Sequence, residues 1–297
     1  MLREVVHAVD LGKGNVGIRQ ALQQLVTRHG AKTVADDAGQ IRVHNASTED
    51  LDEGFGTFAS RGAIKGGNAV VDGVKNFVEE ITRFAGEVMG RAANNLRWEK
   101  GAIADHDGTI LYDLPTLAKY AAARQRSVEA TGSYFSTGLT FSYGAHAAYV
   151  AVDPRTGAVE VLDYYAAEDI GVAINPMVVH GQLIGSIVQG LGGAFLDHLI
   201  YDEDGQFLTG TLADYLVPTA TDFPKVRGEG YGEKLASTNP LGVKGAGEGG
   251  IVGVAGAVAN AVAAALRPLD VKITSLPLSP PRIWKSIAGA ANQVSNN

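Results

Sequence analysis

The chain has 297 residues, of which 45% are hydrophobic and 19% are charged, and its formal net charge is −7. This length and composition suit one large globular domain or two of moderate size, and the acidic balance argues against a nucleic-acid surface, which needs clustered Lys and Arg. The sequence contains no cysteine, so the chain cannot supply a thiolate to an iron–sulfur cluster, form a disulfide or use a cysteine nucleophile. Any redox chemistry must therefore come from a bound cofactor or a partner chain.

Neither end of the sequence suggests a membrane. The opening "MLREVVHAVDLGKG" lacks the apolar core of a secretory signal. The apolar stretch Ile251–Leu266 is too short and too rich in Gly and Ala to span a bilayer as it stands. We therefore expect a soluble cytoplasmic protein with no membrane association.

In the first half of the chain, apolar spacing predicts a helix over Val16–Arg28, followed by a short strand in "IRVHNASTED". A Gly-rich loop over Glu53–Gly67 then leads into an amphipathic helix whose apolar positions keep the helical period from Val70 to Val88. The segment "GAIADHDGTI" predicts a turn-linked hairpin, and Leu114–Arg124 predicts another short helix.

From Ala145 onward the pattern changes to alternating apolar and polar residues on both sides of a turn at Asp153–Gly157, which predicts a hairpin. A long helix is predicted from about Met177–His198, and a final large helix begins at Glu248 and stops at Pro268.

Between and after these helices the chain is extended. The segment Tyr215–Arg227 is punctuated by proline, and "VKITSLPLSP" predicts a strand with a proline-rich exit. The mixture of strands and helices has no βαβ regularity and no internal repeat. The predicted fold class is therefore α+β, in two lobes that comprise residues 1–144 and 145–297.

Glu248 stands among glycines in "VKGAGEGG", directly before an apolar run that contains no acid or base. Taken alone, a glutamate at a helix start is most often a cap, favoured by the helix dipole and by free N–H groups. Two features favour a functional role. The neighbouring glycines let a ligand approach the backbone, and the helix behind Glu248 is apolar all round, which predicts that its N-terminus lies inside the protein. A general base in a dry pocket is one use of such a carboxylate.

The loop "TFASRG" contains groups that are typical of an anion-binding site. Consecutive N–H groups from Phe58 to Arg61, the Ser60 hydroxyl and the start of the following helix can all face a phosphate. Arg61 can add a guanidinium fork. A surface salt bridge from Arg61 to Asp52 or Glu53 is the structural alternative.

Gln189 lies in "IVQGLGGAF", on an apolar helix spaced with glycines. A buried amide there must form hydrogen bonds, either with a cofactor or with a backbone carbonyl of an adjacent helix. Gly190 would let a cofactor or another helix come close.

Other candidate sites are weaker. His146, His180 and His198 are expected to be packing residues rather than metal ligands, because no pair of them has metal-ligand spacing. A nucleotide-binding module built on "GLGGAF" is disfavoured, because no strand immediately precedes the motif and no acid follows at the dinucleotide spacing.

Together, "VKGAGEGG", "IVQGLGGAF" and "GFGTFASRGAIKGGNAV", with "INP" between them, resemble the molybdenum-binding subunit of the xanthine dehydrogenase, aldehyde oxidase and carbon monoxide dehydrogenase family. The order and separation of the three Gly-rich blocks carry the resemblance, which extends from about Ile41 to Ile287. It implies the two-lobed molybdopterin-binding domain of the family's large subunit.

The resemblance also implies an activity. Glu248 falls on the glutamate that, in this family, takes a proton from a hydroxyl on molybdenum, after which the oxygen attacks an electron-poor carbon and hydride passes to a sulfido ligand. Gln189 is similar to the family's glutamine that faces the cofactor, and the TFASRG loop resembles a "GSRS"-type turn that holds the pterin and pyrophosphate. Ala59 and Gly62 depart from that turn, so hydroxyl contacts are not expected at these two positions.

The cofactor-binding residues implied in this way are Phe58, Ala59, Ser60, Arg61, Gln189, Gly190, Lys244, Gly245, Ala246 and Gly247, with no protein ligand to the metal. For Lys244 a solvated charge is an equal alternative. The implied cofactor is molybdopterin with molybdenum, taken to be the cytosine dinucleotide form.

The chain also departs from the family. It has no "GGGFG" segment, and "DLGKGNVGIRQAL" resembles a degraded "DxGQG" turn in which Lys13 replaces a glutamine. These departures imply a split C-terminal half, similar to the medium molybdopterin subunit of nicotinate dehydrogenase. The expected partners are an N-terminal molybdopterin-binding chain, a small subunit with 2Fe-2S clusters, a flavin subunit with FAD, and a small-molecule substrate.

Two functions remain open from the sequence. The first is a subunit of a molybdenum hydroxylase that inserts a water-derived oxygen at an electron-poor carbon of an N-heteroaromatic or an aldehyde. The second is a non-catalytic subunit that keeps the fold and the partner surface of such a complex, a possibility motivated by the degraded turn at Gly12–Gly14.

Overall fold

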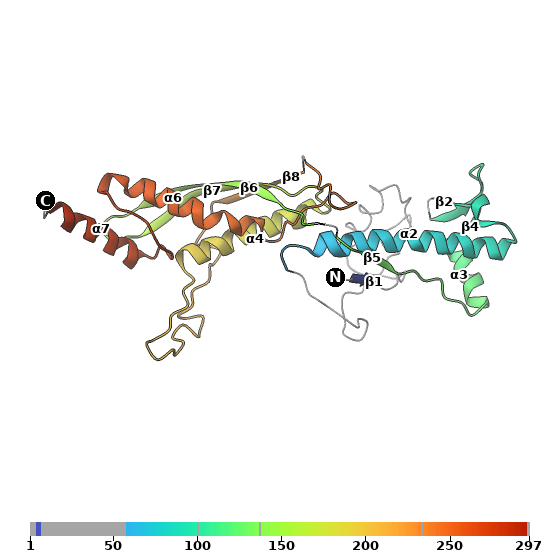
Figure 1. The fold of residues 1–297 in the computed structure, drawn as a ribbon, viewed down its shortest axis with the longest axis horizontal. Coiled ribbons are helices and arrows are strands. Elements are labelled where there is room, and N and C mark those ends of the chain that lie inside the picture. The colour runs from blue at the N-terminus through green and yellow to red at the C-terminus, as the bar shows by residue number, and fades with distance from the viewer. Residues whose placement is uncertain (1–3, 7–57, 100, 137, 233, 296–297) are drawn as a thin grey trace. The chain divides into compact units, whose positions relative to one another are not determined.

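The computed structural model describes residues 4–6, 58–99, 101–136, 138–232 and 234–295 (Figure 1). They form two compact units. The first contains the described residues up to Thr140 together with Leu235–Lys244, and the second contains Phe141–Lys234 and the residues from Gly245 onward. The sequence-based division after residue 144 uses a single cut, whereas the chain here returns once to the first unit.

Side-chain hydrogen bonds to the backbone hold the returning segment Leu235–Lys244 in the first unit. The buried Asn68 side chain accepts a hydrogen bond from the Leu241 N–H at 3.1 Å. Nδ2 of Asn68 also donates to Oδ1 of Asn239 at 3.4 Å. Within the segment, the buried Asn239 side chain bonds both the carbonyl and the N–H of Val243, at 2.9 and 3.2 Å. Such bonds leave no periodic trace in a sequence, which is why this return was not predicted.

The first unit is built around one long helix, α2 (Gly62–Met89). It begins at Gly62, so Gly62–Gly67, which the sequence assigns to a loop, are helical. Its predicted apolar stripe is confirmed, and Phe84 on that stripe is fully buried. The helix ends where Gly90 adopts φ 63° and donates its N–H to the Gly86 carbonyl, a conformation that glycine adopts without strain.

Short elements pack against the C-terminal half of α2 to form the core of the first unit. They are η2 (Ala93–Asn95), β2 (Arg97–Glu99), β3 (Ala102–Ala104), β4 (Ile110–Asp113) and α3 (Leu114–Ala123). The three strands form an antiparallel sheet in the order β2-β3-β4. The hairpin predicted from "GAIADHDGTI" is the β3–β4 pair, and the predicted helix at Leu114–Arg124 is α3.

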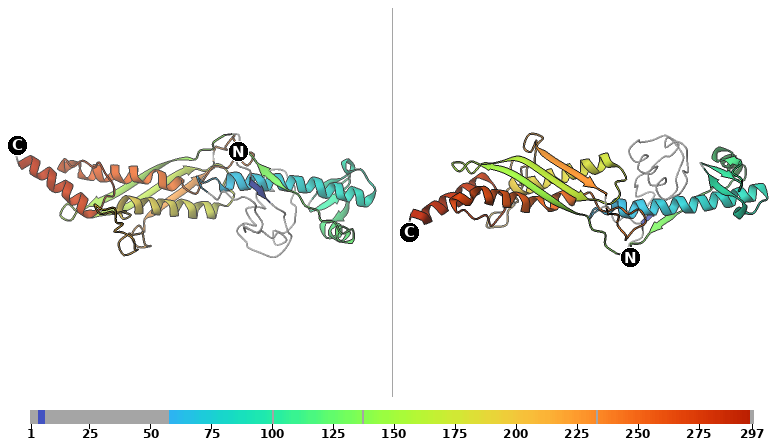
Figure 2. Two further views of the ribbon diagram at one scale, coloured as in Figure 1. Left: turned by 60° about the horizontal axis from the view of Figure 1, so that its bottom comes forward. Right: turned by 90° about the horizontal axis from the view of Figure 1, so that it is seen from above.

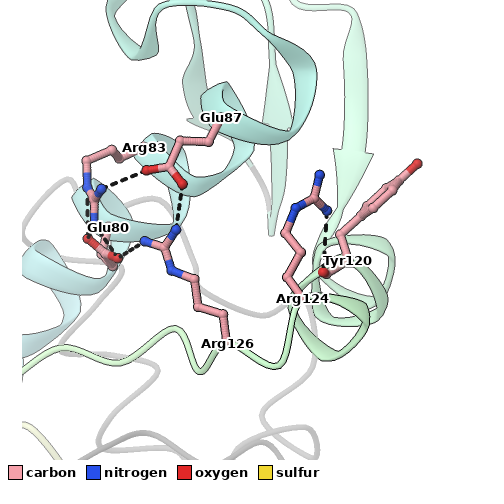
Figure 3. A network of polar contacts seen from close by, with 6 residues as sticks. All are labelled: Glu80, Arg83, Glu87, Tyr120, Arg124 and Arg126. Carbon is pink, nitrogen blue, oxygen red and sulfur yellow. Dashed lines mark hydrogen bonds and ion pairs between the residues drawn. The ribbon is translucent and has the colours of Figure 1, made fainter.

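An ion-pair network ties the segment after α3 to α2 (Figure 3). Arg126 contacts the carboxylates of Glu80 at 3.0 Å and Glu87 at 2.5 Å. Arg83 contacts the same two carboxylates at 2.6 and 2.7 Å. The hydrogen bond from Arg83 is the main cause that lowers the pKa of Glu80, and Arg126 acts in the same direction.

A second sheet of the first unit crosses α2 at a very short distance. β5 (Gly132–Tyr134) pairs antiparallel with β1 (Glu4–Val6). A Cβ atom added to Gly132 would lie 2.2 Å from the backbone nitrogen of Gly73 on α2. Only a residue without a side chain allows this approach between strand and helix.

The second unit contains a three-stranded sheet with β7 at its centre. The hairpin predicted around Asp153–Gly157 is confirmed as β6 (Tyr143–Val152) and β7 (Val159–Asp169). The third strand, β8 (Val226–Tyr231), pairs parallel with β7. The predicted long helix is α4 (Pro176–Phe195), and it connects these two parallel strands as a βαβ crossover that the sequence did not predict. The long segment 196–225 separates α4 from β8 and hides the βαβ spacing.

Two helices, α4 and α6 (Val254–Leu266), run along the sheet, as Figures 1 and 2 show. They cover the same face of the sheet, because Gly228 of β8 lies against Leu183 of α4, while His146 of β6 lies against Gly253 at the start of α6. Valine, leucine and isoleucine side chains from α4, α6 and the strands fill the space between them.

The final predicted helix is broken and only half buried. It consists of a short helix α5 (Gly249–Val252) and of α6, with Gly253 between them. The buried residues of α6 are Val254, Val258, Val262 and Leu266, one stripe at four-residue spacing. The stretch Gly249–Leu269 is long and apolar enough by length and composition to cross a membrane, but here one side of it packs on the sheet.

The C-terminal segment differs from its prediction. The helix ends in the 3-10 turn η3 (Arg267–Leu269), which contains Pro268. The strand predicted in "VKITSLPLSP" is wrong: this stretch is irregular, and it is held by a hydrogen bond of 2.7 Å from the Leu278 N–H to the Ala194 carbonyl. A helix that was not predicted, α7 (Pro280–Ser295), follows. The predictions for Val16–Arg28, "IRVHNASTED" and "DLGKGNVGIRQAL" lie outside the described residues.

Candidate functional site

Glu248 immediately precedes α5 and is exposed to solvent in the chain by itself. The prediction that it lies inside the protein is therefore wrong for this chain. The physical reason is that α5 has only four residues and that the apolar run behind it buries one stripe rather than its whole circumference. The carboxylate can thus be reached by a ligand that approaches the second unit from outside.

The glycines around Glu248 are required by packing. A Cβ atom at Gly249 would lie 1.8 Å from Oε2 of Glu168, and one at Gly250 would lie 2.2 Å from Oγ of Ser186. The backbone at Gly253 has φ −86° and ψ −13°, which any residue adopts, yet a Cβ atom there would lie 2.3 Å from Cδ2 of His146. The start of α5 therefore sits directly on side chains from the sheet and from α4.

A buried polar cluster lies under α5. The Glu168 residue on β7 is only 2% exposed. His146 on β6 lies between Glu168 and Tyr164: its Nε2 is 3.4 Å from Oε1 of Glu168, and its Nδ1 is 2.7 Å from the Tyr164 hydroxyl. Burial is the main cause that raises the pKa of Tyr164, and the negative charge of Glu168 adds to it. The phenol therefore stays protonated and shares a hydrogen bond with Nδ1 of His146.

This cluster was not predicted from the sequence. The expectation that His146 packs in a strand is correct, but its two polar partners were not predicted. The available signal was the period of two along β6 and β7, which places Tyr164 and Glu168 on the buried face of the sheet. An acid at a buried position of a strand indicates a specific partner.

The helix α4 contributes Gln189 and Gly190. Gln189 is exposed, so the prediction of a buried amide that needs an internal partner is wrong. Gly190 is buried, and a Cβ atom added there would lie 2.7 Å from Cγ2 of Val254. The sequence left open whether a cofactor or another helix comes close to Gly190. In the structure, the neighbour is the helix α6.

The exposed side of α4 carries further glycines beside Gln189. Gly181, Gly185 and Gly193 have no atom within 4 Å of an added Cβ, apart from their own surroundings in the helix. With Gln189 they recur every four residues and share one side of the helix. This side is open in the chain by itself.

The loop Phe58–Arg61 forms a tight turn directly before α2. The Arg61 N–H donates to the Phe58 carbonyl at 3.2 Å, and the two central residues, Ala59 and Ser60, have φ values of 51° and 53°. Left-handed conformations at two successive residues with side chains are costly and often occur at ligand sites. The Arg61 guanidinium lies 3.9 Å above the Phe58 ring. The alternative partners Asp52 and Glu53 lie outside the described residues.

Lys244 is only 6% exposed, so the alternative that it is a solvated charge is wrong. It is the last residue of the segment that returns to the first unit. Gly245, Ala246 and Gly247 connect it to Glu248, and they are buried or half-buried.

Two other histidines of the described residues were expected to be packing residues. His180 is exposed and His198 is half-buried. Among the residues that the structure describes, no group of three or more His, Asp or Glu side chains could hold a metal ion.

The sequence profile of the molybdopterin cofactor-binding domain matches residues 9–224 of the chain. The chain therefore belongs to the molybdopterin cofactor-binding domain family, as a molybdenum-binding subunit of the xanthine dehydrogenase and carbon monoxide dehydrogenase type.

Individual relatives agree with this family. The gamma subunit of the 6-hydroxypseudooxynicotine dehydrogenase complex of Paenarthrobacter nicotinovorans is 28% identical over 288 residues, which cover 95% of this chain and 36% of the relative. The nicotine 6-hydroxylase large subunit of the same organism is 31% identical over 250 residues, which cover 80% of this chain and 30% of the relative. The chain thus spans about a third of the length of these relatives.

Solved structures share the fold. Quinoline 2-oxidoreductase from Pseudomonas putida 86 superposes with a TM-score of 0.78 at 32% identity, over 96% of this chain and 38% of that one. Reconstituted CO dehydrogenase from Oligotropha carboxidovorans gives a TM-score of 0.80 at 22% identity and supports the fold alone.

Proposed function

We propose that this chain is part of a molybdenum hydroxylase that inserts a water-derived oxygen at an electron-poor carbon of a small molecule. The observation that carries the proposal is the position of Glu248: an accessible carboxylate that follows three small residues in a chain of the molybdopterin-binding family. We propose an N-heteroaromatic substrate in preference to an aldehyde, because the names of two relatives refer to nicotine and quinoline.

Three parts of the chain fit a molybdopterin cofactor. The turn at Ala59 and Ser60, two successive residues with left-handed backbone, lies directly before α2, where a helix start favours an anion, and Arg61 adds a cation for a pyrophosphate. The open side of α4 offers the Gln189 amide beside glycines that leave room for a bulky group. Gly245, Ala246 and Gly247 offer backbone groups next to Glu248.

When bound, the molybdenum–pterin centre supplies two-electron redox chemistry. Glu248 acts as the general base: a carboxylate oxygen accepts the proton of the attacking water-derived oxygen, and it returns that proton to solvent. Gln189 donates or accepts a hydrogen bond that orients the cofactor. The cytosine dinucleotide form of the cofactor is part of this proposal, since Arg61 suits a pyrophosphate.

The rest of the assembly is also proposed. Because Glu248 and Gln189 are exposed in this chain, we propose that a second molybdopterin-binding chain completes the cofactor site. Small iron–sulfur and flavin subunits would carry the electrons away, because the chain has no cysteine for an iron–sulfur cluster. We propose that the complex is soluble and cytoplasmic.

The alternative is a non-catalytic subunit of such a complex, motivated by Lys13 in the degraded glycine turn. Metal and pterin analysis of the purified complex separates the two functions. We expect about one molybdenum per copy of the chain together with a pterin nucleotide, and turnover of N-heteroaromatic compounds with a dye as electron acceptor. A complex that assembles without molybdenum or pterin would favour the alternative.

A further inference from the structure

The acid that precedes α5 has a second, buried acid beneath it. Glu168 lies on the central strand of the sheet and is 2% exposed. Its Oε2 would be 1.8 Å from a Cβ atom at Gly249, the residue that follows Glu248. Among the described residues, Oε1 of Glu168 has no hydrogen-bond partner and lies 3.4 Å from Nε2 of His146. A buried carboxylate in this state is retained for a specific task or a specific contact.

His146 supports the other end of the same short helix. The ring would be 2.3 Å from a Cβ atom at Gly253, which follows the last residue of α5. The hydrogen bond of 2.7 Å between the Tyr164 hydroxyl and Nδ1 fixes the ring. The other ring nitrogen, Nε2, lies on the side of Glu168.

A helix of four residues has no stability of its own. The position of α5 is therefore set by what packs against it. Gly249 rests on Glu168 and Gly253 rests on His146, both from the sheet, while Gly250 between them rests on Ser186 of α4. The Glu168 carboxylate therefore lies directly against Gly249, the residue that follows Glu248.

We propose that Glu168, oriented by His146 and Tyr164, is a positioning residue that fixes the direction of the Glu248 side chain. This inference rests on the proposed role of Glu248 as the general base. Glu168 touches neither substrate nor cofactor in this scheme. It acts through the backbone of Gly249. The packing of Glu168 and His146 also explains why glycine is needed at Gly249 and Gly253, where the approach of a ligand does not require it.

The test uses the assembled complex with Glu168→Ala, Glu168→Gln and the matched control Glu160→Ala, an exposed acid on the same strand. Three quantities are measured: kcat and KM, the molybdenum content, and amide hydrogen exchange over residues 247–253. For Glu168→Ala we expect kcat to fall by about 100-fold, as for a displacement of about 1 Å in a reacting group, with KM and molybdenum content unchanged. Exchange should rise over residues 247–253 and stay unchanged in β6 and α4.

The conservative variant and a second variant guard against misfolding. Glu168→Gln keeps the contact with Gly249, so most of the kcat should be restored. Gly249→Ala pushes the same peptide away from an intact Glu168 and should reproduce the loss of kcat without removing the buried acid.

Two outcomes would overturn the inference. Glu168→Ala and Gly249→Ala could leave kcat and the exchange of residues 247–253 unchanged, or exchange could rise equally throughout β6 and α4, as expected for a general loss of stability. Glu248→Gln, measured in parallel, separates this failure from that of the proposed function. Full turnover in that variant would refute the general base, whereas the exchange data would still report whether Glu168 holds α5.

Discussion

Gly249 and Gly253 show what the glycines near Glu248 do. The sequence suggests that they clear space for a ligand, but the space that a side chain would need is taken by Glu168 and His146 of the same chain. The order of residues reveals that side chains are missing. It does not reveal which atoms replace them, because the strands that supply those atoms lie about 100 residues away.

Arg61 is the residue at which cofactor binding is most directly tested. We predict that Arg61→Ala lowers the affinity of the complex for its cofactor by about 10-fold or more, because a hydrogen bond to a charged group contributes about 1.5–3 kcal/mol. The measurement is the pterin nucleotide retained after gel filtration. Lys65→Ala removes an equal charge one turn further along α2 and serves as the control. Equal retention in the two variants would contradict a specific role for Arg61.

At the scale of elements, the contact between α4 and α6 depends on one glycine. Gly190→Ala would place a Cβ atom 2.7 Å from Val254, and we predict a loss of about 1–3 kcal/mol in the free energy of unfolding, as for other overpacked cores. Gly185→Ala on the open side of the same helix should instead stabilise the chain by up to about 1 kcal/mol, since alanine favours helix. Urea unfolding compares the two. Similar free energies of unfolding for both variants would contradict the prediction, because they would show that α4 and α6 can move apart at position 190 without a loss of stability.

The network around Arg126 gives a pH-dependent prediction. The pKa of Glu80 is lowered in the folded chain, chiefly by Arg83 and also by Arg126. A lowered pKa contributes stability that is present above the unfolded value of 4.5 and is lost as the pH falls through the folded value. Because these side chains are partly exposed, the contribution is modest.

Arg126→Ala should therefore destabilise the chain modestly at neutral pH, as for other partly exposed ion pairs, and by less under acidic conditions in which Glu80 is protonated. Denaturant unfolding at the two pH values measures the difference, and Lys75→Ala, an exposed lysine on the same helix, provides the control. A loss that stays constant with pH would mean that Arg126 acts through its contact with the Phe84 ring rather than through its ion pair with Glu80.

Elements with a strong local period could be predicted from the sequence. The helices α2, α3 and α4 and the β6–β7 hairpin follow from apolar spacing and turn residues. The parallel pairing of β8 with β7 could not be predicted, because it joins residues about 60 positions apart across an irregular segment. The break at Gly253 was also missed, since an apolar run without charges looks the same whether it is one helix or two.

At the scale of the whole molecule, the family was predicted from three glycine-rich blocks and is confirmed by the match to residues 9–224. The site residues are less determined. Glu248 and Gln189 are exposed here rather than buried, and the chain spans about a third of the length of its relatives. An open site of this kind fits a cofactor that is enclosed only when further protein is present.

The assembled complex is therefore the object in which Glu248 must be tested. The decisive measurement is the turnover of Glu248→Gln at a molybdenum content matched to that of the unmodified complex. We predict a loss of kcat of at least about 100-fold, since general-base catalysis contributes about 10²–10⁴-fold. Undiminished turnover in a fully loaded Glu248→Gln complex would contradict the role of this carboxylate as the base.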